Sequence, residues 1–176
     1  MIATPQAVPV VSIVGTADSG KTTFLEKLIA ELSSRGVRVA TVKHHLHDYD
    51  VDIPGKDSWR HARAGSVVAM VSSPEKLSLV QKVAQEMTLP ELAAIAFVAG
   101  SDILLTEGYK REGVNRVEVR RRERGEELLS NGASLLALVT DMPEAAPQGV
   151  PVFGLDDAAG VADLVQSRFL GKMGGA

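Results

Sequence analysis

The clearest chemistry in the sequence lies near its start, in Gly15-Thr16-Ala17-Asp18-Ser19-Gly20-Lys21-Thr22. This spacing fits the P-loop pattern of Gly, four residues and then Gly-Lys-Thr. In such a loop, backbone N–H groups point inward and the dipole of the following helix favours bound phosphate oxygens. The lysine reaches the outer phosphates and the threonine hydroxyl binds Mg²⁺. We therefore predict a nucleoside triphosphate site formed by this loop together with the next residue, Thr23.

A second candidate is the acid that follows an apolar run, Glu107 in Ile103-Leu104-Leu105-Thr106-Glu107-Gly108-Tyr109-Lys110. In P-loop proteins, an acid at a neighbouring strand end holds the magnesium shell or orients a water molecule. Glu107 is thus both the catalytic and the metal candidate, and the competing interpretation is that it caps a turn. Asp102 precedes the run and would lie at the wrong end of the strand.

The polar segment 43–58 is unusual because it holds three of the four histidines. An EF-hand loop would need glycine at Ile53 and glutamate at Trp59, so we exclude a calcium loop. A transition-metal site, a solvated loop and a nucleotide or substrate loop remain open. The metal site would use His44, His45 and His47.

Two later segments carry further candidates. Asp141 follows the apolar run Leu135–Val139, where its carboxylate could accept hydrogen bonds from guanine N1 and N2. The Asn-Lys-x-Asp motif of ordinary GTPases is absent, so the guanine hypothesis rests on Asp141 without that motif. The run Arg116–Arg124 alternates and then becomes basic, which favours a solvated edge strand, with contact to an anionic ligand or partner as the alternative.

The elements that would position these residues form an alternating pattern. Apolar runs at 10–14, 37–43, 103–107, 135–139 and 151–153 predict strands, and helical spacing predicts helices after the P-loop, at 89–98 and at 158–170. Segments 67–71 and 76–83 predict a hairpin. We expect an α/β, P-loop NTPase-like three-layer fold whose mixed, mostly parallel sheet is flanked by helices.

Length and composition limit the classes of function that the chain could have. The chain has 176 residues, 4% aromatic residues, no cysteine and a net charge of −3. We expect one nucleotide-binding domain, 1–176, with 1–8 and 171–176 loose. The absence of cysteine and of any leader or membrane-spanning run favours the cytoplasm and no membrane association. The net negative charge gives no general attraction to nucleic acid.

Taken together, the P-loop, Lys43-His44 with His47-Asp48, Asp52-x-Pro54-Gly55-Lys56-Asp57-Ser58 and Glu107-Gly108-Tyr109-Lys110 resemble molybdopterin-guanine dinucleotide biosynthesis protein B, MobB. The resemblance runs from about Val10 to Phe153. It implies a GTP- and Mg²⁺-binding homodimer that assists the MobA-like guanylyltransferase in attaching GMP to molybdopterin. It also implies that Lys21 and Thr22 hold phosphate and metal, with Glu107 nearby and Asp141 as the guanine candidate. Molybdopterin is a further candidate ligand.

We therefore expect a GTP-binding accessory protein with at most slow hydrolysis, because no arginine finger can be named from the sequence. Two alternatives remain open. One is a P-loop kinase that phosphorylates a small metabolite held by the histidine loop and Arg120–Arg124. The other is a nucleotide-gated adaptor whose output is partner binding.

Overall fold

The computed structural model describes residues 7–45, 51–124, 128–130 and 134–171. Its internal contacts divide the chain into two compact units, one of residues 45–88 and one of residues 1–44 with 89–176. The single-domain expectation stays a prediction. Most of the two terminal segments expected to be loose lies outside the described residues, although Val8, which belongs to one of them, is buried.

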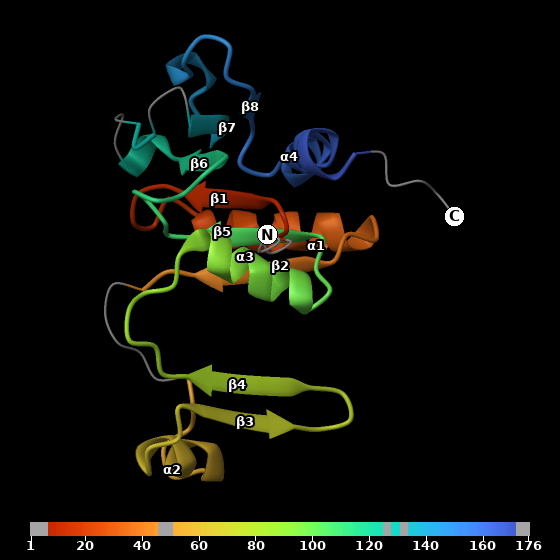
Figure 1. Ribbon diagram of the computed structural model, residues 1–176. Helices are drawn as coiled ribbons and strands as arrows, with labels where there is room; N and C mark the ends of the chain where they lie inside the picture. The colour runs from red at the N-terminus through yellow and green to blue at the C-terminus, as the bar shows by residue number, and fades with distance from the viewer. Residues whose placement is uncertain (1–6, 46–50, 125–127, 131–133, 172–176) are drawn as a thin grey trace, which may run out of the picture. The chain divides into compact units, whose positions relative to one another are not determined.

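The larger unit is built on one six-stranded sheet, ordered β2-β5-β1-β6-β7-β8, in which every pairing is parallel (Figure 1). Its strands are short, and β1, β5 and β7 are largely apolar, as expected for strands that are covered on both faces. The carboxyl ends of parallel strands share one edge of a sheet, so residues that follow these strands can meet there. The strands are β1 (Val10–Val14), β2 (Val39–Lys43), β5 (Ile103–Glu107), β6 (Arg116–Arg120), β7 (Leu135–Thr140) and β8 (Val152–Phe153).

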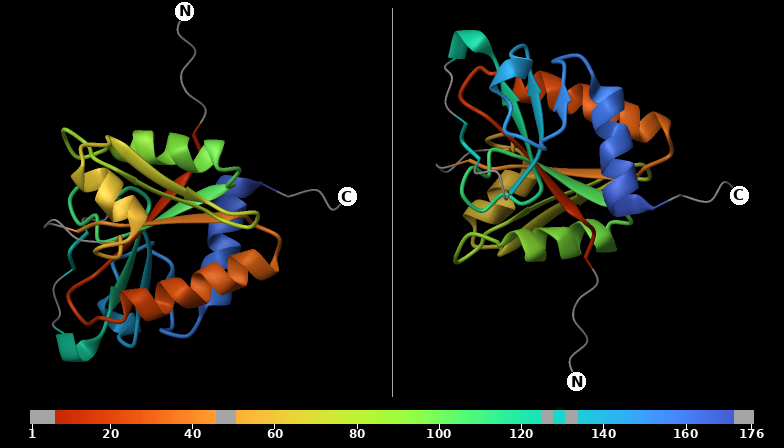
Figure 2. Two further views of the ribbon diagram at one scale, coloured as in Figure 1. Left: turned by 90° about the horizontal axis from the view of Figure 1, so that it is seen from below. Right: turned by 90° about the horizontal axis from the view of Figure 1, so that it is seen from above.

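Helices cover both faces of this sheet. Helix α1 (Lys21–Ser34) and helix α4 (Ala158–Val165), which continues into a π-helical turn at Gln166–Leu170, share one apolar core with β1, β5, β6 and β7. Helix α3 (Leu89–Val98) packs on the other face through a smaller cluster. Figure 2 shows α1 and α3 on opposite sides of the sheet. The predicted α/β three-layer fold is confirmed.

The smaller unit contains the predicted hairpin. Strand β3 (Val68–Ser72) pairs antiparallel with β4 (Leu77–Gln81), and helix α2 (Asp57–Arg63) contacts β3. The hairpin forms its own two-stranded sheet, so the antiparallel pair expected within a mixed sheet is not hydrogen-bonded into the sheet of parallel strands. The N-cap of α2 is Lys56, and the Ser58 hydroxyl in the first turn donates to Asp52 Oδ1 at 2.9 Å.

One expectation about the charged segment 116–124 is wrong. Strand β6 is an interior strand between β1 and β7, not a solvated edge. Its Glu118 and Arg120 side chains are buried. The Glu118 carboxylate accepts the backbone N–H groups of Leu129 and Ser130, each at 2.9 Å, and these bonds satisfy its charge inside the protein. Short 3₁₀ turns follow β6 and β7, at Arg122–Arg124 and Pro143–Ala145.

Candidate functional site

The P-loop joins the carboxyl end of β1 to the first turn of α1, as the motif predicts. Gly15 has φ +152°, and a Cβ there would lie 2.4 Å from Val119 O, so only glycine fits beside β6. Gly20 has φ +92° and is the N-cap of α1. Asp18 takes the left-handed conformation, with φ +55°, which Asp and Asn tolerate better than most residues. The loop thus has the turn that a phosphate cradle requires.

Lys21 lies over this loop. Its ammonium donates to the backbone oxygen of Thr16, and the residue is partly buried. Burial lowers the pKa of Lys21, and the Glu107 carboxylate opposes that shift. A polyanion bound in the loop would favour the charged ammonium further. Ala17 and Thr23, two other predicted contact residues, are exposed at the loop and in the first turn of α1.

The two predicted metal ligands meet. The Thr22 hydroxyl donates to Glu107 Oε1 at 2.8 Å, although the residues are far apart in sequence. The parallel register explains this contact because it places Glu107 opposite Ile13, two residues before Gly15. Glu107 is 7% exposed, and its carboxylate also lies 3.5 Å from Lys43 Nζ.

A hydroxyl and a carboxylate are oxygen ligands of the kind that Mg²⁺ prefers, and Mg²⁺ sites on P-loops are completed by phosphate oxygens and water. No group of three or more His, Asp or Glu side chains able to hold a metal occurs within the described ranges. The oxygen donors of Thr22 and Glu107 suit a magnesium ion that is bound together with a nucleotide.

The loop also fits an anion. The Ser19 side chain is fully buried, and its hydroxyl has no hydrogen-bond partner among the described residues. This hydroxyl lies beside Gly15, because a Cβ on Gly15 would be 2.7 Å from Ser19 Oγ. Unsatisfied buried hydroxyls are costly, so an acceptor oxygen entering the loop would be stabilised by it.

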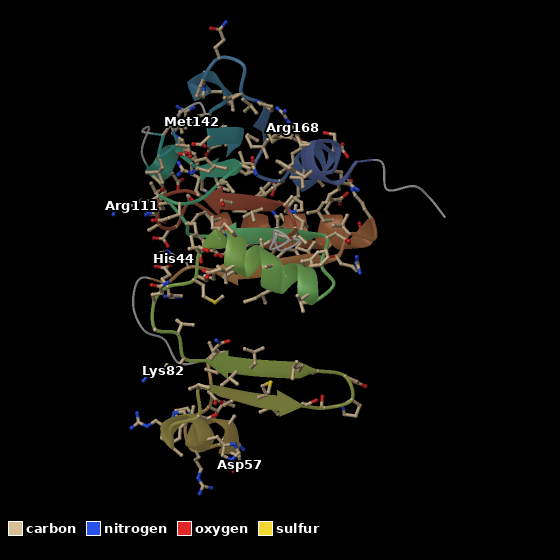
Figure 3. All side chains as sticks on the ribbon, in the orientation of Figure 1. His44, Asp57, Lys82, Arg111, Met142 and Arg168 are labelled. Atoms are coloured by element: carbon tan, nitrogen blue, oxygen red, sulfur yellow. The ribbon has the colours of Figure 1, made fainter. Side chains whose placement is uncertain are left out.

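The histidine segment is placed only in part. The His44 N–H donates to Glu107 O at 2.8 Å, and the His44 ring stacks on Tyr109 with ring centroids 4.6 Å apart. Figure 3 shows His44 at the edge where β2 ends. Gly108 has φ +99°, and a Cβ on this residue would lie 3.2 Å from His44 O. Both the backbone conformation and the close contact favour glycine in this turn. His47 lies outside the described residues, so the three-histidine metal site stays a hypothesis.

Asp141 lies at the carboxyl end of β7, two strands from β1 in the sheet order. It is exposed, and its Oδ1 accepts the backbone N–H of Arg122 at 2.9 Å. The side chain is thus on the edge that carries the P-loop, and its role in reading guanine stays a prediction.

The sequence pattern does not distinguish Arg121 from the other charged residues of 116–124. In the structure, Arg121 Nε donates to Ser19 O in the P-loop at 3.2 Å. Arg124 reaches the same loop, with Nη2 3.8 Å from Asp18 Oδ2. Arg121 follows β6 directly, and β6 lies beside β1 in the sheet, so this contact depends on a strand order that the sequence pattern alone does not give.

Comparison with known proteins agrees with this geometry. The family model described as "Molybdopterin guanine dinucleotide synthesis protein B", MobB, matches residues 10–141, which include the P-loop, Glu107 and Asp141. The chain belongs to the MobB family. Its sequence is similar to that of the molybdopterin-guanine dinucleotide biosynthesis adapter protein of Haemophilus influenzae, with 36% identity over 77% of this chain and 76% of the relative. The Escherichia coli protein of the same name is 33% identical over 90% of this chain and 91% of that relative.

Solved structures of this family share the fold. The crystal structure of Bacillus subtilis MobB superposes with a TM-score of 0.72 at 31% identity, covering 92% of this chain and 98% of that one. A MobB homologue from Bacillus stearothermophilus gives a TM-score of 0.66 at 29% identity, covering 90% and 95%. Within the described parts of this MobB-family chain, no helix has the length and apolar character needed to cross a bilayer.

Proposed function

We propose that this chain is a GTP- and Mg²⁺-binding adapter in the synthesis of the molybdopterin-guanine dinucleotide cofactor, acting in the cytoplasm beside a MobA-like guanylyltransferase. The observation that carries the proposal is the Thr22–Glu107 hydrogen bond at the mouth of the P-loop, because it pairs two oxygen ligands where triphosphate would bring Mg²⁺. The printed names of the relatives, which describe adapter proteins of this pathway, support the biological role.

Different groups of the chain would bind different parts of the nucleotide and its metal. Backbone N–H groups of residues 16–23 and the start of α1 would hold phosphate oxygens, and Lys21 would add a charge. Glu107 already faces Thr22 and the Lys43 ammonium, so it suits the metal shell better than it suits taking a proton from water. Hydrolysis is therefore expected to be slow, and GTP binding would serve to regulate the partner rather than to drive chemistry.

Two measurements test this role. Calorimetric titration should show GTP binding that strengthens when Mg²⁺ is added. Pull-down of a purified MobA-like guanylyltransferase should depend on a non-hydrolysable GTP analogue. A partner interaction that ignores the nucleotide would count against the adapter role. The kinase alternative requires a different result, namely labelled γ-phosphate appearing on a metabolite rather than as free phosphate.

We also propose a homodimer, supported by the β3–β4 hairpin. Its side chains are largely apolar and exposed, with Met70 61%, Leu77 62% and Leu79 53% exposed. A two-stranded hairpin is marginally stable alone, and exposed apolar side chains on it favour burial against a partner. A second copy offers the same surface, which suits the self-complementary contact of a twofold dimer.

A further inference from the structure

Arg121 lies against the P-loop from the β6 side. Besides its bond to Ser19 O, its guanidinium lies beside Gly20: a Cβ on Gly20 would be 3.2 Å from Arg121 Nε and 3.4 Å from Nη2. Gly20 thus serves two purposes, because it permits φ +92° and because its missing side chain leaves room for this arginine. The residue is half-buried, which reduces solvent screening of its charge.

The other charged groups of the site indicate how a nucleotide would be oriented in it. Glu107 and Lys43, which lie near the Thr22 hydroxyl, come from β5 and β2, on one side of β1. Metal and outer phosphates bound by these groups would lie on that side. A nucleotide that continued across the loop from there would bring its inner phosphate toward the other neighbour of β1, which is β6. Arg121 is the residue that follows β6 directly.

We propose that Arg121 binds the α-phosphate of the nucleotide, as a second cation that complements Lys21 on the outer phosphates. This inference rests on the proposed function, since it assumes that the P-loop holds a guanine nucleotide. It adds a binding residue that neither the P-loop motif nor the metal pair requires.

The chemistry suits that role. A guanidinium carries five N–H donors, and the bond to Ser19 O uses one of them. The remaining donors can pair with a phosphate while Nε keeps its hold on the loop, and such charge-assisted pairs are stronger than a bond to a neutral carbonyl. The buried Ser19 hydroxyl, unpartnered among the described residues, supplies a further polar group on the same residue that Arg121 contacts.

The adjacent arginine gives a matched control. Arg122 Nη2 pairs with Glu144 at 2.7 Å, and both side chains are more than half exposed. Substitution of Arg122 removes the same charge one residue away without touching Ser19 or Gly20. Any effect of general electrostatics on the nucleotide should therefore appear in both variants, whereas a direct contact should appear only at Arg121.

The test compares wild type, Arg121→Gln, Arg121→Lys and Arg122→Gln by competition of GTP, GMP and pyrophosphate against a fluorescent GDP analogue. GMP carries only the α-phosphate, and pyrophosphate can occupy the outer positions alone. We expect Arg121→Gln to lower the affinities for GMP and GTP about tenfold or more. The affinity for pyrophosphate should change less than about twofold. Arg121→Lys should recover part of the loss, and Arg122→Gln should resemble wild type.

Three results would overturn the inference. An equal loss of GMP affinity and pyrophosphate affinity would mean that Arg121 only maintains the shape of the loop. An unchanged thermal unfolding midpoint of ligand-free Arg121→Gln would not alter that conclusion. Unchanged GMP affinity would mean that there is no contact. If wild type binds neither GTP nor GMP, the proposed function fails as well, whereas normal wild-type binding with an unaffected Arg121→Gln refutes only this inference.

Discussion

Thr22 in the first turn of α1 and Glu107 at the end of β5 share a hydrogen bond of 2.8 Å. The loop of β1 and the end of β5 are thereby joined at one point of the sheet edge. Because Lys43 Nζ lies 3.5 Å from the same carboxylate oxygen, a hydroxyl, a carboxylate and an ammonium converge where the outer phosphates and their metal would bind.

Glu107→Gln should remove the dependence of GTP binding on Mg²⁺. Glutamine can still accept the Thr22 hydrogen bond, so the loop should keep its shape, but the negative charge that attracts the metal is lost. Calorimetry with and without Mg²⁺ measures this directly. In EDTA the variant should match wild type within about threefold, because hydrogen bonding without the metal is preserved. Full Mg²⁺ enhancement in the variant would exclude Glu107 from the metal shell.

Asp141→Asn should reduce the preference for GTP over ATP by about tenfold, the usual scale for losing a charge-assisted hydrogen bond. Asparagine keeps an oxygen for the Arg122 N–H, which wild type holds at 2.9 Å, so the local turn should persist. Competition titration of GTP and ATP provides the ratio. Glu144→Gln, which removes a neighbouring carboxylate paired with Arg122, is the control. An unchanged ratio would place base reading elsewhere.

Leu79→Glu should convert the proposed dimer to monomer at micromolar concentration. Leu79 is 53% exposed on β4, and a charge there would have to be desolvated in an apolar interface. Sedimentation equilibrium gives the mass. Ser78→Glu adds the same charge to the opposite face of the same strand and should leave assembly less affected. A Leu79→Glu protein that remains dimeric would move the interface away from the hairpin.

The pair Arg38 and Asp102 should make stability sensitive to acid. Hydrogen bonds from the Arg38 guanidinium lower the pKa of Asp102, with Nη2 at 2.5 Å and Nε at 3.1 Å from its oxygens. The folded pKa lies below the unfolded one, so the pair stabilises the protein above the ordinary pKa of aspartate. That contribution is lost as pH falls through the folded pKa.

Asp102→Asn should therefore lower the free energy of unfolding modestly near neutral pH, because the pair is solvent-screened, and should have no effect in strong acid. Urea denaturation across pH measures the difference. Arg38→Gln should flatten the same part of the profile. A difference between Asp102→Asn and wild type that stays constant with pH would assign the effect to packing rather than to charge.

Much of the fold follows from local pattern. The apolar runs of β1, β5 and β7 predict buried parallel strands, and the order of strand, Gly-rich loop and amphipathic helix identifies the P-loop. The sequence predicts that Glu107 lies near Thr22. Glu107 ends one parallel strand, and Thr22 follows the loop at the carboxyl end of another. The contact itself depends on the register of β1 and β5, which also aligns Lys43 with Glu107.

Other features depend on distant groups. The charges of β6 resemble those of an edge strand, but Glu118 is buried because the backbone of Leu129 and Ser130 donates to it. No local pattern shows those donors. The contact of Arg121 with Ser19 likewise requires the sheet order, and a run of four consecutive or near-consecutive arginines does not reveal which one faces the loop.

The most direct test of nucleotide binding is calorimetric titration of GTP with Mg²⁺ into wild type and Lys21→Ala. We predict saturable binding by wild type and a loss of roughly 1.5 to 3 kcal/mol in the binding free energy of the variant, because a charge-assisted contact to the outer phosphates is removed. Equal affinity in the two proteins, or no binding by wild type, would contradict the assignment of Gly15 to Thr23 as a triphosphate site.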